Sequence, residues 1–221
     1  MTLLGRIISF YPTFILLLAF TDVCWFGYQP SVIQPVVFLI IIYIVPPVSL
    51  RIHQAIFPIK ETRSNLAKRH YSAWWGAHQI QVLYIAVPHL EALLRIIPGA
   101  YSAWLRLCGS KVGRKVYWTP NIEITDRSML EIGDRVVFGH QCKLLGHAIT
   151  PKGSAMILFV RKIKIGNDVF VGAGSRIGLG AEIADGVFLP VLTDVFMNQK
   201  IETSPVEKNS LMQAVANSQK S

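Results

Sequence analysis

The feature that most constrains this chain is an aliphatic residue that recurs every six positions in its C-terminal half. The uninterrupted run is Ile165, Val171, Ile177, Ile183, Leu189, Val195 and Ile201. The same spacing appears upstream at Ile132, Phe138 and Leu144, and its phase slips by two residues between Ile124 and Ile132. A repeat of this kind constrains the fold before any local propensity does, and a six-residue period is typical of parallel β-helices.

The period has a simple physical reason in a coil with three sides. Each short strand points one aliphatic side chain at the axis, and small residues such as Gly166, Gly172 and Gly178 follow it. We expect these small residues to let the backbone turn each corner, because glycine tolerates the positive φ that such corners require. The sequence therefore predicts a mainly β domain over 109–205.

The N-terminal segment has a different composition. Ile7–Ala19 is a first apolar stretch, and a second one, Val23–Leu50, contains no charged residue. About 20 apolar residues are enough to cross the hydrocarbon core of a bilayer. Because the residues at 27–31 are typical of a turn, we expect a transmembrane helical hairpin over 1–52. A cleaved signal peptide and a buried soluble hairpin are the alternatives, and the first apolar stretch has no small-x-small cleavage site.

Charge gives the expected orientation. Residues 51–70 carry five basic residues against one acidic residue, directly after the second apolar stretch. Basic residues in this position favour the cytoplasmic side. We therefore expect an integral membrane protein with its C-terminal domain on the cytoplasmic face. The net charge of +9 is accompanied by no RNA-binding motif, helix-turn-helix or zinc finger, so no nucleic-acid partner is predicted.

Residues 53–108 are predicted to form a basic linker and amphipathic helices that lie at the membrane surface. The aromatic side chains of Trp74, Trp75, Tyr84 and Trp104 suit the headgroup layer. Ordinary packing between helices explains the same residues equally well. The tail over 206–221 is polar and is predicted to be disordered.

Three segments in the repeat region carry a resemblance to a known family. They are Leu130–Val136 (LEIGDRV), Leu144–Ala148 (LLGHA) and, after a loop, Ile163–Gly172 (IKIGNDVFVG). In this order they resemble the hexapeptide-repeat acyltransferases, such as the galactoside and xenobiotic acetyltransferases. Residues 70–115 look more like the membrane-attached hexapeptide region that ends some peptide synthetases.

The resemblance implies a left-handed β-helix that assembles as a homotrimer and takes acetyl-CoA or another acyl-CoA as co-substrate, with no tightly bound cofactor. His147 matches the family's general base, at the mouth of a groove between subunits. An imidazole suits this role because its pKa near 6.5 permits proton transfer at neutral pH. A surface histidine at a corner of the coil is the alternative.

The resemblance also assigns binding residues. Phe170, Gly172, Gly174 and Ser175 fall on the path of the CoA pantetheine arm, although they are also ordinary corner residues. Asp126 and His140 are candidates for acceptor binding, and a solvated loop acid and a turn histidine are the alternatives. This chain departs from the family where Phe170 replaces a tryptophan and where Thr203–Glu207 replaces a Gly-x-Pro-Ala-Lys ending.

One segment of the expected loop over 148–162 is unusually apolar. It is Ala155–Val160, and it contains Ile157 and Phe159. We expect this segment to face the membrane or an acyl chain.

Taken together, these features predict a membrane-anchored acyltransferase that acts on a hydroxyl or amine of a hydrophobic or lipid-linked acceptor. One alternative is a non-catalytic trimeric scaffold at the membrane. Another is a metal-dependent enzyme like the gamma-class carbonic anhydrases, whose zinc needs three histidines. Because the repeat region offers only His140 and His147, we predict no metal site.

Overall fold

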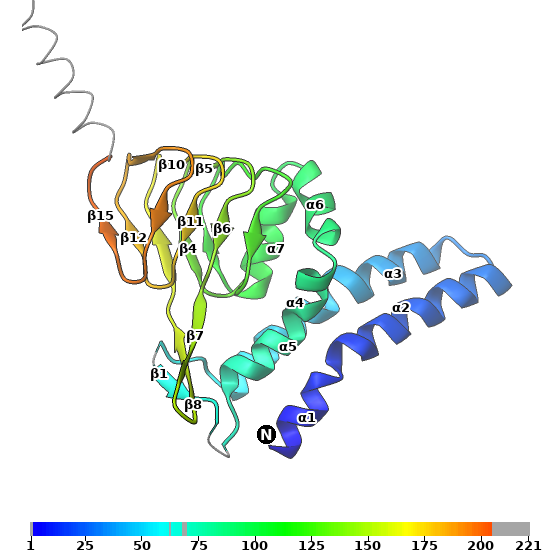
Figure 1. Cartoon of the computed structure of the whole chain (residues 1–221). Coiled ribbons are helices and arrows are strands. Elements are labelled where there is room, and N and C mark those ends of the chain that lie inside the picture. Colours follow the sequence, from blue (N-terminus) through cyan, green and yellow to red (C-terminus); the bar gives the residue numbers. More distant parts are fainter. Residues whose placement is uncertain (1, 62, 68–69, 205–221) are drawn as a thin grey trace, which may run out of the picture.

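A computed structural model describes residues 2–61, 63–67 and 70–204, so the tail predicted over 206–221 lies outside the described residues. Helices make up the N-terminal half, and a stack of short strands follows them (Figure 1). The helices are α1 (Leu3–Ser9), α2 (Tyr11–Tyr28), α3 (Ile33–Tyr43), α4 (Val45–Ile56), α5 (Ala73–Ala86), α6 (His89–Ile96) and α7 (Ala100–Cys108).

The strands of the repeat region form three parallel sheets, one for each side of a coil. The first sheet has the order β13 (Phe188–Leu189), β10 (Phe170–Val171), β5 (Val137–Phe138). The second has the order β14 (Asp194–Val195), β11 (Arg176–Ile177), β6 (Lys143–Leu144), β3 (Glu123–Ile124). The third has the order β15 (Lys200–Ile201), β12 (Glu182–Ile183), β9 (Ile163–Ile165), β4 (Leu130–Ile132), β2 (Lys111–Val112).

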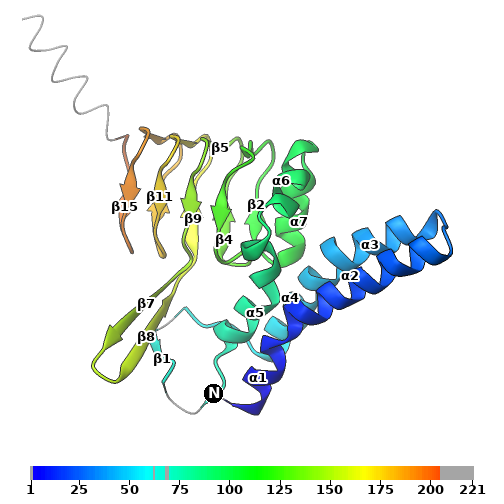
Figure 2. The same ribbon diagram turned by 45° about the vertical axis from the view of Figure 1, so that its right-hand side comes forward.

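The strand register confirms the predicted parallel β-helix. Val171 lies opposite Leu189, and Ile177 lies opposite Val195. Partners are therefore three hexads apart in sequence, so three hexads complete one coil and the coils stack as Figure 2 shows. The left hand of the coil stays a prediction.

The glycines of the repeat have a different role from the one we expected. A Cβ on Gly172 would lie 2.3 Å from the carbonyl carbon of Pro190 in the next coil. The positive φ occurs two residues later, at Gly174 (φ 71°) and equally at the non-glycine Asp168 (φ 56°). The small residue after each aliphatic residue therefore permits close stacking of coils, and the corner itself lies further along the hexad.

Helices α5 and α7 pack on the first coils, and most of their aromatic residues are buried, whereas Trp75 is half-buried. Trp74, Tyr84 and Trp104 are each no more than 5% exposed. The Tyr84 hydroxyl donates to the Ile42 carbonyl (2.6 Å), and the Trp104 indole donates to the Tyr43 carbonyl (3.0 Å). The expectation that these three rings anchor in the headgroup layer is therefore wrong. The alternative, packing between helices, is what the structure shows.

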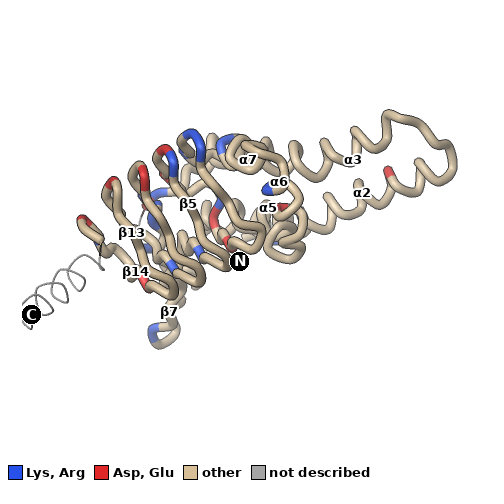
Figure 3. The backbone as a smooth tube through the Cα atoms, turned by 90° about the horizontal axis from the view of Figure 1, so that it is seen from above, with Lys and Arg blue, Asp and Glu red and all other residues tan. Residues whose placement is uncertain are grey.

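Two continuous apolar helical stretches extend away from the β-helix. Leu3–Tyr28 and Ile33–Ile56 are 26 and 24 residues long, and each is long and apolar enough to cross a bilayer. Leu17, Phe20 and Leu39 are more than half exposed on them. Figure 3 shows that charged residues gather on the turns of the β-helix, whereas the hairpin of α2 and α3 carries almost none.

The expected loop over 148–162 is a β-hairpin. Strands β7 (His147–Lys152) and β8 (Ala155–Val160) are antiparallel, and β1 (Arg63–Asn65) pairs with the far edge of β8. Leu158 and Val160 are buried in a cluster with Trp74, and Ile157 is only 9% exposed. The apolar run is therefore explained mainly by packing against the body of the protein, which corrects the expectation that it faces a membrane or an acyl chain.

Candidate active site

A hydrogen-bonded histidine and aspartate form the centre of the candidate site. His147 stands where the chain leaves the coil to begin β7, and Asp126 lies in the segment where the hexad phase slips. The His147 Nδ1 and Asp126 Oδ2 atoms are 2.6 Å apart. The Asp126 side chain is 3% exposed and that of His147 is 17% exposed. The carboxylate is thus buried behind an imidazole that solvent can reach.

Three side chains hold the Asp126 carboxylate. The Trp74 indole N–H donates to Oδ1 (2.9 Å), and the Thr125 hydroxyl donates to Oδ2 (2.7 Å), beside His147. Burial by itself raises the pKa of Asp126, but the hydrogen bonds from His147, Thr125 and Trp74 outweigh burial and hold the pKa below its usual value. The carboxylate is therefore ionised at neutral pH.

The hydrogen bonds of Asp126 suit a role other than the acceptor binding that the resemblance implies. Both of its oxygens already accept hydrogen bonds within the chain. A carboxylate on Nδ1 fixes the imidazole with Nδ1 protonated, which leaves the lone pair on Nε2 as the proton acceptor. Asp126 is thus placed to orient His147 and to stabilise its protonated form.

Helix α5 covers the histidine, and sequence reasoning missed this contribution. The His78 ring stacks on Trp74 (centroids 4.9 Å apart) and meets His147 edge to face (5.4 Å). Burial lowers the pKa of His78, so this second imidazole is neutral at pH 7. The signal available in the sequence was the spacing of Trp74 and His78, since residues four apart share one face of a helix.

The donor atoms of His78, Asp126 and His147 all lie within 4.8 Å of one another, which raises the question of a metal ion. The Asp126 oxygens accept three hydrogen bonds, one of them from the His147 ring itself. A metal ion that used Asp126 as a ligand would have to displace these donors. The arrangement fits proton transfer better than a structural zinc site with four ligands.

The residues proposed for the cofactor lie in different environments. Phe170 is 39% exposed and stacks on Phe188, with centroids 5.0 Å apart. Gly172 packs between coils, and the buried Ser175 hydroxyl donates to the Pro190 carbonyl (3.1 Å). Of the four, Phe170 is on the surface and Gly174 lines a cavity, whereas Gly172 and Ser175 have structural partners.

The second acceptor-binding candidate, His140, is exposed on the turn between β5 and β6. Its backbone carbonyl accepts a hydrogen bond from the Gly174 N–H (2.8 Å). The ring contacts that surround His147 come from Trp74 and His78, both on α5.

No protein-family model and no curated protein matches this chain. Among solved structures, it is similar to a hexapeptide-repeat containing acetyltransferase from Vibrio cholerae O1 biovar eltor complexed with acetyl coenzyme A. The identity is 16%, the match covers 54% of this chain and 80% of that chain, and the TM-score is 0.43.

Two further solved structures are similar at lower TM-scores. One is a mutant of AntD, an N-acyltransferase from Bacillus cereus, in complex with dTDP and coenzyme A (10% identity, 50% of this chain, 81% of that chain, TM-score 0.32). The other is serine acetyltransferase isoform 3 from Entamoeba histolytica in complex with cysteine (12% identity, 85% of this chain, 70% of that chain, TM-score 0.30).

Proposed function

We propose that this protein is a membrane-anchored acyltransferase that moves an acetyl or other acyl group from a CoA thioester to a hydroxyl or amine of a hydrophobic or lipid-linked acceptor. The observation that carries the proposal is the His147–Asp126 pair. A partly exposed imidazole backed by a buried, ionised carboxylate has the arrangement required of a general base.

The proposed step needs no covalent intermediate with the enzyme. The Nε2 atom of His147 accepts the proton of the acceptor O–H or N–H while the oxygen or nitrogen attacks the thioester carbonyl. As the tetrahedral adduct collapses, the carbon–sulfur bond breaks and the CoA thiolate takes the proton from the imidazolium. Asp126 stabilises the imidazolium between these two transfers, as a carboxylate does in a hydrolytic triad.

The apolar hairpin supports the membrane part of the proposal. Its helices expose large apolar side chains along most of their length, which water disfavours and a lipid environment accommodates. The basic residues that follow it favour a cytoplasmic active site.

Phe170 remains the candidate to contact the donor. The exposed pair Phe170 and Phe188 offers a surface that other copies of the chain would cover in the proposed homotrimer. Cross-linking of the purified protein should then yield a three-chain species.

The test uses membranes from cells that lack the gene as the source of acceptor. Purified full-length protein and acetyl-CoA labelled in the acetyl group are added, and label is followed into the lipid extract together with release of free CoA. We expect His147→Ala to reduce transfer by roughly 10²–10⁴-fold, the usual contribution of a general base. His70→Ala is the control, because His70 is an exposed histidine to which no role in the site is assigned.

Transfer by His147→Ala at the rate of the unchanged protein would exclude His147 as the base. A complete lack of transfer from every acyl-CoA tried would instead favour the scaffold alternative.

A further inference from the structure

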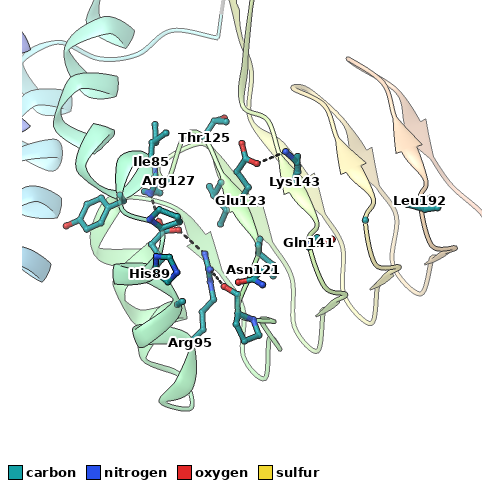
Figure 4. Close-up of a pocket in the computed structure, with 18 residues that line it drawn as sticks. Ile85, His89, Arg95, Asn121, Glu123, Thr125, Arg127, Gln141, Lys143 and Leu192 are labelled. Carbon is teal, nitrogen blue, oxygen red and sulfur yellow. Dashed lines mark hydrogen bonds and ion pairs between the residues drawn. The ribbon is translucent and has the colours of Figure 1, made fainter.

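A cavity of about 850 Å³ lies between the helical layer and the first coils of the β-helix. Figure 4 shows Ile85 and His89 on its helical side and Asn121, Glu123 and Lys143 on the strand side. A space of this size is typical of sites for small organic ligands. Much of its wall is apolar, with contributions from Tyr84, Ile85, Pro88, Ala92, Ile122, Ile124 and Leu192.

Buried charges at one end of this cavity are unequal in number. Glu91 accepts hydrogen bonds from the guanidinium groups of both Arg127 (2.5 Å) and Arg95 (2.8 Å). Glu123, which also lines the cavity, is paired with Lys143 at 2.7 Å. Two guanidinium groups therefore share one carboxylate, and the local charge is positive by one.

Both guanidinium groups are buried, but Arg127 has fewer partners. Among the described residues its guanidinium donates only to Glu91, and its Nη1 atom has no hydrogen-bond partner. The guanidinium of Arg95 also donates to the Pro120 carbonyl and the Tyr101 hydroxyl. A buried charge without full compensation is unfavourable, because it has lost its hydration. A buried donor with no partner is expected to meet a bound water or ion. Because Arg127 also lines the cavity, an anionic group bound there would compensate the charge.

We propose that this cavity binds an anionic amphiphile, with a carboxylate or phosphate headgroup beside Arg127 and an apolar chain along the wall of α5, α6 and β3. The headgroup would balance the second guanidinium, and the chain would remove apolar surface from water. The cavity adjoins the candidate active site, because Thr125 lines it and donates to Asp126, but neither Asp126 nor His147 lines it. The proposal does not rest on acyl transfer.

The experiment uses the full chain purified in a neutral maltoside detergent. Thermal unfolding and native mass spectrometry are recorded with four probes: palmitate, a single-chain lysophosphatidate, a neutral monoacylglycerol and inorganic phosphate. A ligand that binds only the native state raises the melting temperature. We expect palmitate or lysophosphatidate to bind and to raise it, and the stronger of the two identifies the headgroup. The neutral lipid should have little effect.

Two variants locate the site. Arg127→Met leaves Glu91 paired with Arg95, so the buried charges then balance, and we expect at least a 10-fold loss of affinity for the anionic probe. Ala92→Phe fills the cavity from α6 without changing charge and should also abolish binding. Arg135→Met is the matched control, because Arg135 is an exposed arginine paired with Asp168 outside the cavity.

Equal binding of neutral and anionic lipids would overturn the proposal, as would unchanged binding in Arg127→Met. If Arg127→Met does not fold, Ala92→Phe decides, and unchanged binding in that variant overturns the site. Failure of both anionic lipids to bind overturns it as well. Displacement of the bound lipid by CoA would assign the cavity to the acyl donor and overturn the lipid proposal. Absence of His147-dependent acyl transfer would overturn only the proposed function and would leave the lipid proposal intact.

Discussion

Asp126 is a buried carboxylate whose two oxygens accept hydrogen bonds from three side chains. At the scale of single residues, these bonds do two things. They keep the group ionised despite burial, and they hold the His147 ring in one orientation. Neither Asp126 nor His147 alone has the properties of a general base, because the carboxylate is inaccessible and an unsupported imidazole can adopt either tautomer.

Changing Asp126 to Asn should therefore lower acyl transfer strongly while leaving His147 in place. The asparagine side-chain amide can donate to Nδ1, which favours the tautomer with a proton on Nε2, the wrong atom for a base. We expect a rate loss on the order of 10²–10⁴-fold. The measurement is label transfer from acetyl-CoA, and a rate within a factor of two of the unchanged protein would contradict the orienting role.

The same substitution gives a prediction about stability and pH. The pKa of Asp126 is lower in the folded chain than the value of about 3.9 expected for an unfolded aspartate. Its stabilising contribution is therefore complete above the unfolded value and is lost as the pH falls through the folded value. The difference in melting temperature between the unchanged protein and Asp126→Asn should therefore shrink as the pH falls below the unfolded value. A gap that widens as the pH falls would contradict this assignment.

At the scale of elements, helix α5 completes a site that belongs mainly to the β-helix. Its Trp74 donates to Asp126 from 52 positions away in sequence, and its His78 covers His147. The hexads provide the framework, but the ring contacts around the His147–Asp126 pair come from a helix outside the repeat.

We expect Trp74→Phe to destabilise the protein by about 1–3 kcal/mol, because it leaves a buried carboxylate oxygen without a donor. It should also reduce transfer, since the carboxylate is then held less firmly. Trp75→Phe is the matched control, because the Trp75 indole nitrogen has no hydrogen-bond partner among the described residues. Equal effects of the two changes, in thermal unfolding and transfer assays, would argue that Trp74 acts only by filling space.

The stacking of coils gives a second prediction at this scale. An alanine at Gly172 would place its Cβ against the rigid backbone at Pro190, so neighbouring coils would have to separate. We expect a loss of about 1–3 kcal/mol, typical of overpacking. Gly27→Ala has open space around the added carbon and should cause no loss. Thermal unfolding measures both, and a neutral Gly172→Ala would show that the coil can relax at this position.

At the scale of the whole molecule, the apolar hairpin and the β-helix place a proposed chemical site beside a proposed membrane surface. Leu39 is 53% exposed on α3, in a stretch that we propose lies in lipid. A lysine at such a depth is disfavoured by about 2.5–3.5 kcal/mol. We expect Leu39→Lys to lower the fraction of protein that resists alkaline carbonate extraction from membranes.

Ile96→Lys is the control, because Ile96 is 71% exposed on α6, outside the two apolar stretches. Similar extraction of Leu39→Lys, Ile96→Lys and the unchanged protein would count against insertion of the hairpin.

The repeat, the apolar hairpin and the candidacy of His147 could be predicted from the sequence by itself. The first two depend on local pattern, because period six directs aliphatic side chains such as Val171 to the axis and an unbroken apolar run sets the length of a span. The candidacy of His147 depends instead on the resemblance of its segment to a known family. Asp126 was predicted only as a candidate for acceptor binding in the phase slip, and not as a partner of His147. Where the period fails, local spacing no longer fixes the direction of a side chain.

Only the tertiary structure decided how the phase-slip segment around Asp126 is used. The stacking of coils brings Asp126 to His147, 21 positions later, and the covering helices bring Trp74 to Asp126 and Glu91 to the buried Arg127. These partners meet because burial of polar groups demands hydrogen bonds, and the nearest available donors and acceptors belong to distant parts of the chain. Periodicity therefore determines the framework of this protein, and long-range compensation of buried charge determines its candidate sites.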